Sequence, residues 1–121
     1  MKVKTFQDLV VWQKAHAFVL EVYKLTRQFP EEERFGVTTQ VRRSSVSICA
    51  NIVEGYKKSD REFLRFLDIS QASLEETKYH LILSKDLGYC LHNTFNELTE
   101  ICDELGRMIN GLMRAIRASK T

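Results

Sequence analysis

The 121 residues contain one proline and five glycines, and this scarcity of helix breakers constrains the fold more than any other feature of the sequence. An all-β chain needs many turns, and turns depend heavily on glycine and proline. Pro30, Gly55 and Gly88 stand between long stretches in which apolar residues recur every three or four positions. This is the spacing of one face of a helix. The sequence therefore predicts an all-α protein with four helical segments.

Capping residues and breakers mark the ends of the first two segments. Thr5 followed by Asp8 resembles a capping box, so we expect the first helix to begin there and to end at Pro30. Gly55 is expected to end the second helix as a left-handed cap. Two apolar stripes follow the first helix: Leu9, Trp12, His16, Val19 and Tyr23, and Val11, Ala15, Phe18, Val22, Leu25 and Phe29. They predict a wide apolar arc.

The last two segments have similar signals. Ser59 with Glu62 resembles a second capping box and opens the third helix, which we expect to stop at Gly88. Asn93 is the expected N-cap of the fourth helix. The connections after the second and third helices are short, and short connections make neighbouring helices antiparallel. The predicted fold is an antiparallel up-down-up-down four-helix bundle, formed as one domain by residues 1–121.

Composition limits the environment of the chain. The net charge of +2 is too small to indicate nucleic-acid binding by itself. Cys49, Cys90 and Cys102 are odd in number and scattered, which favours reduced thiols over a disulfide framework. No stretch approaches the roughly 18 apolar residues of a membrane span, and the N-terminus lacks the apolar region of a signal peptide. We expect a cytoplasmic protein with no membrane partner.

No catalytic or cofactor site is predicted. Glu76 and His80 are four residues apart, whereas di-iron bundles use Glu-x-x-His pairs. Cys90 and His92 lack a second pair at metal-binding spacing, so no metal site is expected. His16 lies on the apolar side of the first helix and is expected to be a hydrogen-bonded core residue. The chain is therefore predicted not to be an enzyme and to need no cofactor.

The fourth helix divides by charge. Residues 93–104 contain acids and no base, and residues 105–121 contain bases and no acid. One interpretation is complementarity to the helix dipole, which favours acids near the start and bases near the end. The other is a basic patch that a polyanion could use.

Four polar residues follow one edge of the second helix: Arg43, Ser47, Asn51 and Glu54. If the second and third helices pair around the loop between them, Arg43 comes level with Glu75 and Glu76. An ion pair with either carboxylate would fix the register of the two helices, and Arg43→Ala would then cost roughly 1–3 kcal/mol. The alternative is a polar groove that binds a ligand or a partner helix.

Several motifs together resemble one known family. They include FQDLVVWQKA from Phe6, YKLT from Tyr23, VRRSSVSICANIVEG from Val41 (which contains Arg42 and Arg43) and SLEE from Ser73. The chain is similar to the four-helix-bundle proteins encoded within intervening sequences of bacterial 23S ribosomal RNA genes. It departs at Cys49, where the family commonly has proline, and at Ala72, where glycine is common. The second departure affects how closely the second and third helices approach.

The resemblance implies a homo-pentamer of four-helix bundles. It agrees with the two apolar stripes of the first helix, since one can face the core and the other a neighbouring subunit. A related group of pentameric bundles acts as accessory proteins to the reverse transcriptases of diversity-generating retroelements.

Two functions follow as hypotheses. The first is a non-catalytic oligomeric module that engages structured RNA or a ribonucleoprotein by charge and shape. The second is a scaffold for protein partners, similar to those reverse transcriptase accessory subunits. The candidate RNA contacts are Lys2, Lys4, Lys14, Lys24 and Arg27 in the first segment and Arg107, Arg114, Arg117 and Lys120 in the fourth helix.

Overall fold

The computed structural model describes residues 3–119, which form four long helices and two short 3-10 turns. The elements in chain order are η1 (Phe6–Asp8), α1 (Val10–Thr26), η2 (Glu31–Glu33), α2 (Val37–Gly55), α3 (Asp60–Asp86) and α4 (His92–Ala118). This part of the chain contains no strand. The predicted all-α architecture with four helices is confirmed.

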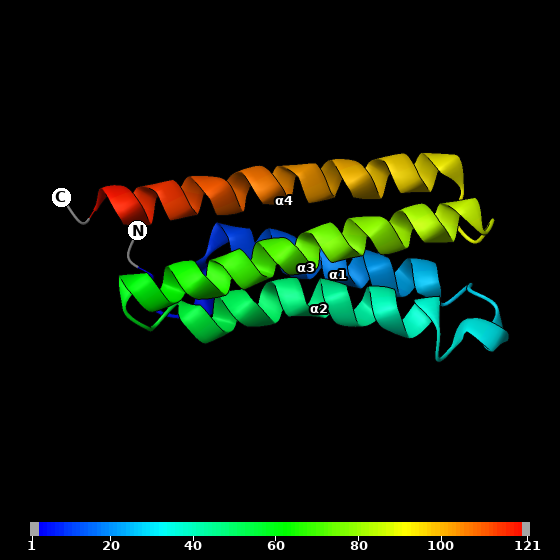
Figure 1. Cartoon of the computed structure of the whole chain (residues 1–121), viewed down its shortest axis with the longest axis horizontal. Helices are drawn as coiled ribbons and strands as arrows, with labels where there is room; N and C mark the ends of the chain where they lie inside the picture. Colours follow the sequence, from blue (N-terminus) through cyan, green and yellow to red (C-terminus); the bar gives the residue numbers. More distant parts are fainter. Residues whose placement is uncertain (1–2, 120–121) are drawn as a thin grey trace.

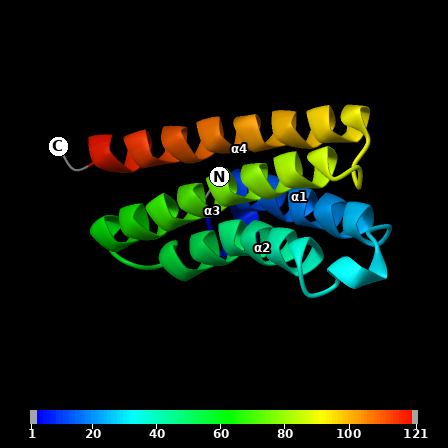
Figure 2. The same cartoon turned by 45° about the vertical axis from the view of Figure 1, so that its right-hand side comes forward.

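Consecutive helices pack against one another along the long axis of the molecule. α2 packs against both α1 and α3, α4 packs against α3, and α4 also meets α1, so the four helices enclose a common core. Figures 1 and 2 show that the α2–α3 turn and the C-terminal end of α4 lie at one end of the molecule. The α1–α2 and α3–α4 connections lie at the other end (Figure 1).

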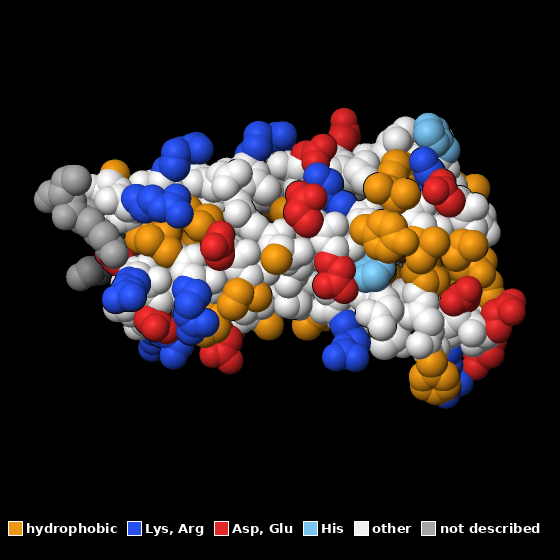
Figure 3. Space-filling model, in the orientation of Figure 1, with side chains coloured by type: hydrophobic (Ala, Val, Ile, Leu, Met, Phe, Trp, Pro, Cys, Tyr) orange, Lys and Arg blue, Asp and Glu red, His pale blue; other side chains and the backbone are white. Residues whose placement is uncertain are grey.

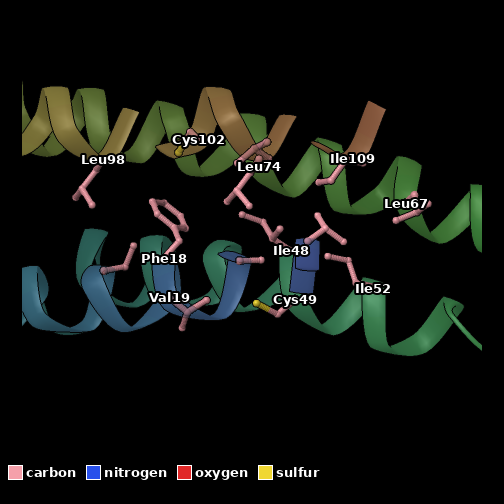
Figure 4. Packing of buried hydrophobic residues seen from close by; sticks show 14 of the residues in the cluster. Phe18, Val19, Ile48, Cys49, Ile52, Leu67, Leu74, Leu98, Cys102 and Ile109 are labelled. Carbon is pink, nitrogen blue, oxygen red and sulfur yellow. The ribbon is translucent and has the colours of Figure 1, made fainter. Parts of the chain in front are cut away.

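Four inward apolar faces form this core. Phe18 of α1, Ile48 of α2, Leu67 of α3 and Leu105 of α4 are almost completely buried. Figure 4 shows the side chains of α1 and α2 meeting those of α3 and α4 across the centre of the bundle. Full burial of one such side chain contributes about 1.5–3 kcal/mol, so this core accounts for most of the driving force for folding.

The first helix begins later than the sequence predicts. Thr5 and Asp8 do form a reciprocal capping box, but it closes the 3-10 turn η1 rather than an α-helix. Leu9 has an extended backbone (φ −76°, ψ 121°) and separates this turn from α1. The extended residue lets the turn fold back, so that the Phe6 ring lies 5.0 Å from Trp12. The contact between Phe6 and Trp12 thus accompanies the break between η1 and α1 at Leu9.

Two further capping predictions are wrong, and one is confirmed. Gly55 is the last residue of α2 and not a left-handed cap, since among residues 3–119 only Gly88 has a positive φ, of 83°. Leu91, not Asn93, is the N-cap of α4. The Ser59 hydroxyl accepts a hydrogen bond from the Glu62 backbone N–H and caps α3 as expected.

Gly55 is required for a different reason, which is space. A β-carbon at this position would lie 2.7 Å from Cβ of Phe66 and 2.9 Å from Cδ1 of Phe63. Both phenylalanines belong to α3, so the glycine allows the end of α2 to approach α3 closely.

Candidate nucleic-acid interface

The two halves of α4 have different surroundings. In its acidic half, Asp103 is 3.2 Å from the Lys78 ammonium of α3, and Glu104 is 3.7 Å from the Lys14 ammonium of α1. The hydrogen bond with Asp103 is the main cause that raises the pKa of Lys78. Two of the four acids in this half therefore face bases of neighbouring helices, an arrangement that neither interpretation of the sequence includes.

The bases of α4 also differ among themselves. Arg107 lines a surface groove of α4 together with four acids of the same helix: Glu97, Glu100, Asp103 and Glu104. Arg114 and Arg117 are exposed, and within residues 3–119 no carboxylate lies within 4.0 Å of either guanidinium group. Arg114 and Arg117 thus lie on a stretch of α4 that contains no acid, whereas Arg107 lies beside the acidic half.

The candidate bases of the first segment do not join this pair. Lys14 is occupied by Glu104. Lys24 shares a groove with Glu21 and Glu97, and Arg27 lies in a groove that contains Glu31. Lys24 and Arg27 are near the C-terminal end of α1 and therefore far from Arg114 and Arg117 (Figure 1).

Of the three remaining candidates, the structure describes only Lys4. Lys4 is exposed, and its backbone N–H donates to the Asp8 carboxylate over 2.9 Å. This bond and the one from Thr5 hold the pKa of Asp8 below its ordinary value. Lys2 and Lys120 lie outside the described residues.

Sequence reasoning missed a second group of bases at the same end of the molecule as Arg114 and Arg117. It consists of exposed side chains on the α2–α3 turn and the start of α3: Lys57, Lys58, Arg61 and Arg65. Figure 3 shows Lys and Arg side chains gathered at this end, with a few acids among them. The dense run from residue 55 to residue 66 could have revealed the group, but Asp60 and Glu62 hide it in any tally of net charge.

Polar residues line a groove of about 430 Å³ between α2 and α3. The Ser47 and Ser73 hydroxyl oxygens are 2.7 Å apart on its floor, and the Asn51 amide donates to the Ser47 carbonyl over 2.8 Å. Arg43 and Glu76 are exposed on its walls. Glu54, the fourth polar residue on this edge of α2, is exposed and is not among the residues that line the groove.

The predicted ion pair of Arg43 is wrong. Within the described chain, the Arg43 guanidinium has no carboxylate within 4.0 Å, because both candidate partners bond to residues on their own helix. Glu76 is 3.0 Å from His80, and Glu75 is 3.6 Å from Lys78. Neither glutamate is buried.

Buried hydroxyl groups fix the register of α2 and α3 instead. Thr77 donates to the Ser44 hydroxyl, and Ser70 donates to the backbone carbonyl of Ile48, each over 2.8 Å.

Arg42 contacts the protein interior, in contrast to its neighbour Arg43. Its Nε donates to the Thr26 hydroxyl over 2.7 Å, and its guanidinium lies 4.5 Å from the centre of the Tyr23 ring. Both partners belong to α1, so this family-motif arginine joins α2 to α1. The contact gives Arg42 a structural role.

The cysteines are buried, whereas His16 and His92 are exposed. His16 is exposed and stacks on Trp12 with ring centres 4.9 Å apart, so the prediction of a core histidine is wrong. Burial raises the pKa of the Cys49 and Cys102 thiols to about 12 and also raises that of Cys90. Residues 3–119 contain no cluster of three or more side chains that could hold a metal ion.

These features define the class of the protein: a small four-helix protein whose exposed bases and polar groove lie on its surface. The chain belongs to the family of 23S rRNA-intervening sequence proteins, whose model matches residues 7–111. The family predicted from the motifs is therefore confirmed.

A solved structure supports the same assignment. A protein of unknown function from the S23 ribosomal protein family of Bacteroides thetaiotaomicron VPI-5482 superposes with a TM-score of 0.79 at 25% sequence identity. The match covers 86% of this chain and 98% of the other. No curated protein has a matching sequence. Among the described residues, no helix has the length and hydropathy needed to cross a membrane.

Proposed function

We propose that this chain is a non-catalytic, homo-oligomeric four-helix bundle that engages structured RNA, alone or within a ribonucleoprotein, by charge and shape. In this proposal the helices run up-down-up-down, and the subunits assemble in the cytoplasm into the pentamer that the family resemblance implies.

The observation that carries the proposal is the basic end of the molecule, which we define as Arg114, Arg117 and the four bases of the α2–α3 region: Lys57, Lys58, Arg61 and Arg65. Arg114 and Arg117 are exposed on an acid-free stretch of α4. Exposed bases without carboxylate partners bind phosphate groups with little sequence preference, because they release condensed counterions from the nucleic acid. Repetition of this end in an oligomer would raise affinity through multivalency.

Two apolar surfaces support self-association. The first is a groove of about 350 Å³ between α1 and α2, lined by His16, Val19, Leu20, Tyr23, Val46 and Cys49. The second is on α3, where Tyr79 is 58% exposed and Ile82 is 43% exposed. A ring of identical subunits joins two different patches of each chain, so two separate apolar surfaces suit such an assembly.

The test of RNA binding is a pair of charge-matched variants. The Arg114→Gln/Arg117→Gln and Lys24→Gln/Arg27→Gln proteins each lose two positive charges from opposite ends. Fluorescence anisotropy with a labelled, structured 23S rRNA fragment at low salt should show a several-fold weaker Kd for the α4 variant only. Equal affinities of both variants and the wild type would contradict the role of the basic end.

One observation favours a second candidate function, a scaffold for protein partners. Tyr79, Ile82, Leu87 and Leu91 expose apolar side chains near the α3–α4 connection, and Figure 3 shows a hydrophobic area there. Large exposed apolar patches commonly mark protein interaction sites. Salt separates the two functions: phosphate binding weakens steeply between about 50 and 200 mM salt, whereas apolar association does not.

A further inference from the structure

The α2–α3 turn combines positive charge with aromatic rings. The Arg65 guanidinium lies 4.8 Å from the centre of the Phe66 ring, and the Lys58 ammonium lies 5.9 Å from the same centre. At the start of the turn, the Lys57 ammonium is 5.9 Å from the Tyr56 ring. These cation–aromatic contacts are within the usual range of about 6 Å and restrain side chains that would otherwise be mobile. The basic stretch of α4 has no such aromatic residues.

The charges of this turn are available to an incoming phosphate. Lys57, Lys58 and Arg61 are exposed and have no carboxylate within 4.0 Å in the described part of the chain. Arg65 is 3.3 Å from Glu62, and the two side chains are 60% and 47% exposed. Exposed ion pairs of this kind contribute about 0–1 kcal/mol, so a phosphate group can displace the carboxylate.

Charge alone would not make this turn a strong site, because Asp60 and Glu62 lower its net charge. Base stacking can supply the binding free energy that the charges alone do not. Unpaired RNA bases stack on aromatic rings and on arginine guanidinium planes, at about 1–3 kcal/mol for each base. A double helix keeps its bases stacked inside, so it offers the turn phosphates, riboses and base edges but no free base face for stacking.

We infer that the α2–α3 turn binds unpaired nucleotides of RNA, with bases stacking at the Arg65–Phe66 pair and phosphates on Lys57, Lys58 and Arg61. The inference rests on the proposed function and makes it more specific. It names the unpaired nucleotides of the RNA as the part that is bound. It also names the α2–α3 turn, which lies outside the candidates derived from the sequence, as the site.

The test compares this cation–aromatic pair with a second pair at the opposite end of the molecule. There the Lys85 ammonium lies 4.4 Å from the centre of the Phe95 ring. The variants are Arg65→Gln/Phe66→Leu and, as the control, Lys85→Gln/Phe95→Leu. The probes are a labelled unstructured RNA of about 12 nucleotides and its duplex, followed by anisotropy.

The wild type should bind the single strand more tightly than the duplex. The Arg65→Gln/Phe66→Leu protein should lose about tenfold in affinity for the single strand, while the control keeps it. A Lys57→Gln/Lys58→Gln protein, altered only between the helices, should also bind more weakly, and it replaces the first variant if that one does not fold.

Three results would overturn the inference. If the turn variants bind as the wild type does while Arg114→Gln/Arg117→Gln weakens binding, RNA is engaged elsewhere and the proposed function stands. If the wild type binds single strand and duplex equally, the inference is again wrong and the proposed function again stands. If the wild type binds no RNA at low salt, both the inference and the proposed function are wrong.

Discussion

Arg42 and Arg43 are adjacent in the family motif but have opposite environments. The Arg42 guanidinium bonds to Thr26 and lies over Tyr23, whereas Arg43 is exposed on the wall of the α2–α3 groove. The sequence suggested Arg43 as the structural residue because its position matched Glu76 across the helix pair. Periodicity identified the correct edge of α2, but it could not show that His80 already occupies the Glu76 carboxylate.

Substitution of each arginine by alanine should separate the two roles. Arg42→Ala removes a partly buried hydrogen bond and a cation–aromatic contact between α1 and α2, so we expect a loss of about 1–2 kcal/mol in the free energy of unfolding. Arg43→Ala should change it by less than about 0.5 kcal/mol. Urea unfolding followed by circular dichroism measures both values. A larger loss in the free energy of unfolding for Arg43→Ala would support the predicted ion pair of Arg43 after all.

At the scale of the elements, the sequence predicted what depends on neighbouring residues and missed what depends on tertiary contact. Ser59 and Gly88 marked helix boundaries because their effects on the backbone are local. The first helix, expected to end at Pro30, already ends at Thr26, and Pro30 instead precedes the 3-10 turn η2. The extended backbone at Leu9 depends on packing of η1 against Trp12, a contact that no local pattern reveals. The bases of the α2–α3 turn become significant only because the fold brings them to the same end as Arg114 and Arg117.

The approach of α2 and α3 gives a test at this scale. In Gly55→Ala the added methyl group would lie 2.7 Å from Cβ of Phe66, and we expect a loss of about 1–3 kcal/mol in the free energy of unfolding. Gly111→Ala is the matched control, since among residues 3–119 its new β-carbon would meet only the Arg114 guanidinium within 4 Å, at 3.9 Å. In the middle of α4, alanine should stabilise by about 0.5–1 kcal/mol.

The measurement is again urea unfolding. Similar changes for the two glycine variants would contradict close packing as the reason for Gly55.

At the scale of the whole molecule, the surface has a basic end and two apolar areas away from it. The net charge of +2 conceals this distribution, because acids of α4 face bases of α1 and α3 while Arg114 and Arg117 have no such partners. The sequence indicated the wide apolar arc of the first helix. It did not show that His16 and Tyr23 line an outward groove with residues of α2.

The apolar groove between α1 and α2 predicts the effect of a charge on assembly. Val46→Glu places a carboxylate in this groove, where Val46 is 40% exposed, and should reduce the mass in solution from an oligomer to the 14.1 kDa monomer. Phe35→Glu is the control, because Phe35 is 86% exposed and does not line the groove. Light scattering after size exclusion measures the masses. A monomeric wild type, or an unchanged mass for Val46→Glu, would contradict self-association through this groove.

The most direct test of RNA engagement is the salt dependence of binding to a structured 23S rRNA fragment. The wild-type protein should lose affinity steeply between about 50 and 200 mM salt, because each phosphate contact releases condensed counterions. In Arg114→Gln/Arg117→Gln, the slope of log K against log salt concentration should be shallower by about 2 for each contacting protomer. Binding that is absent at 50 mM salt, or a slope that is the same in both proteins, would contradict RNA recognition by this end of the bundle.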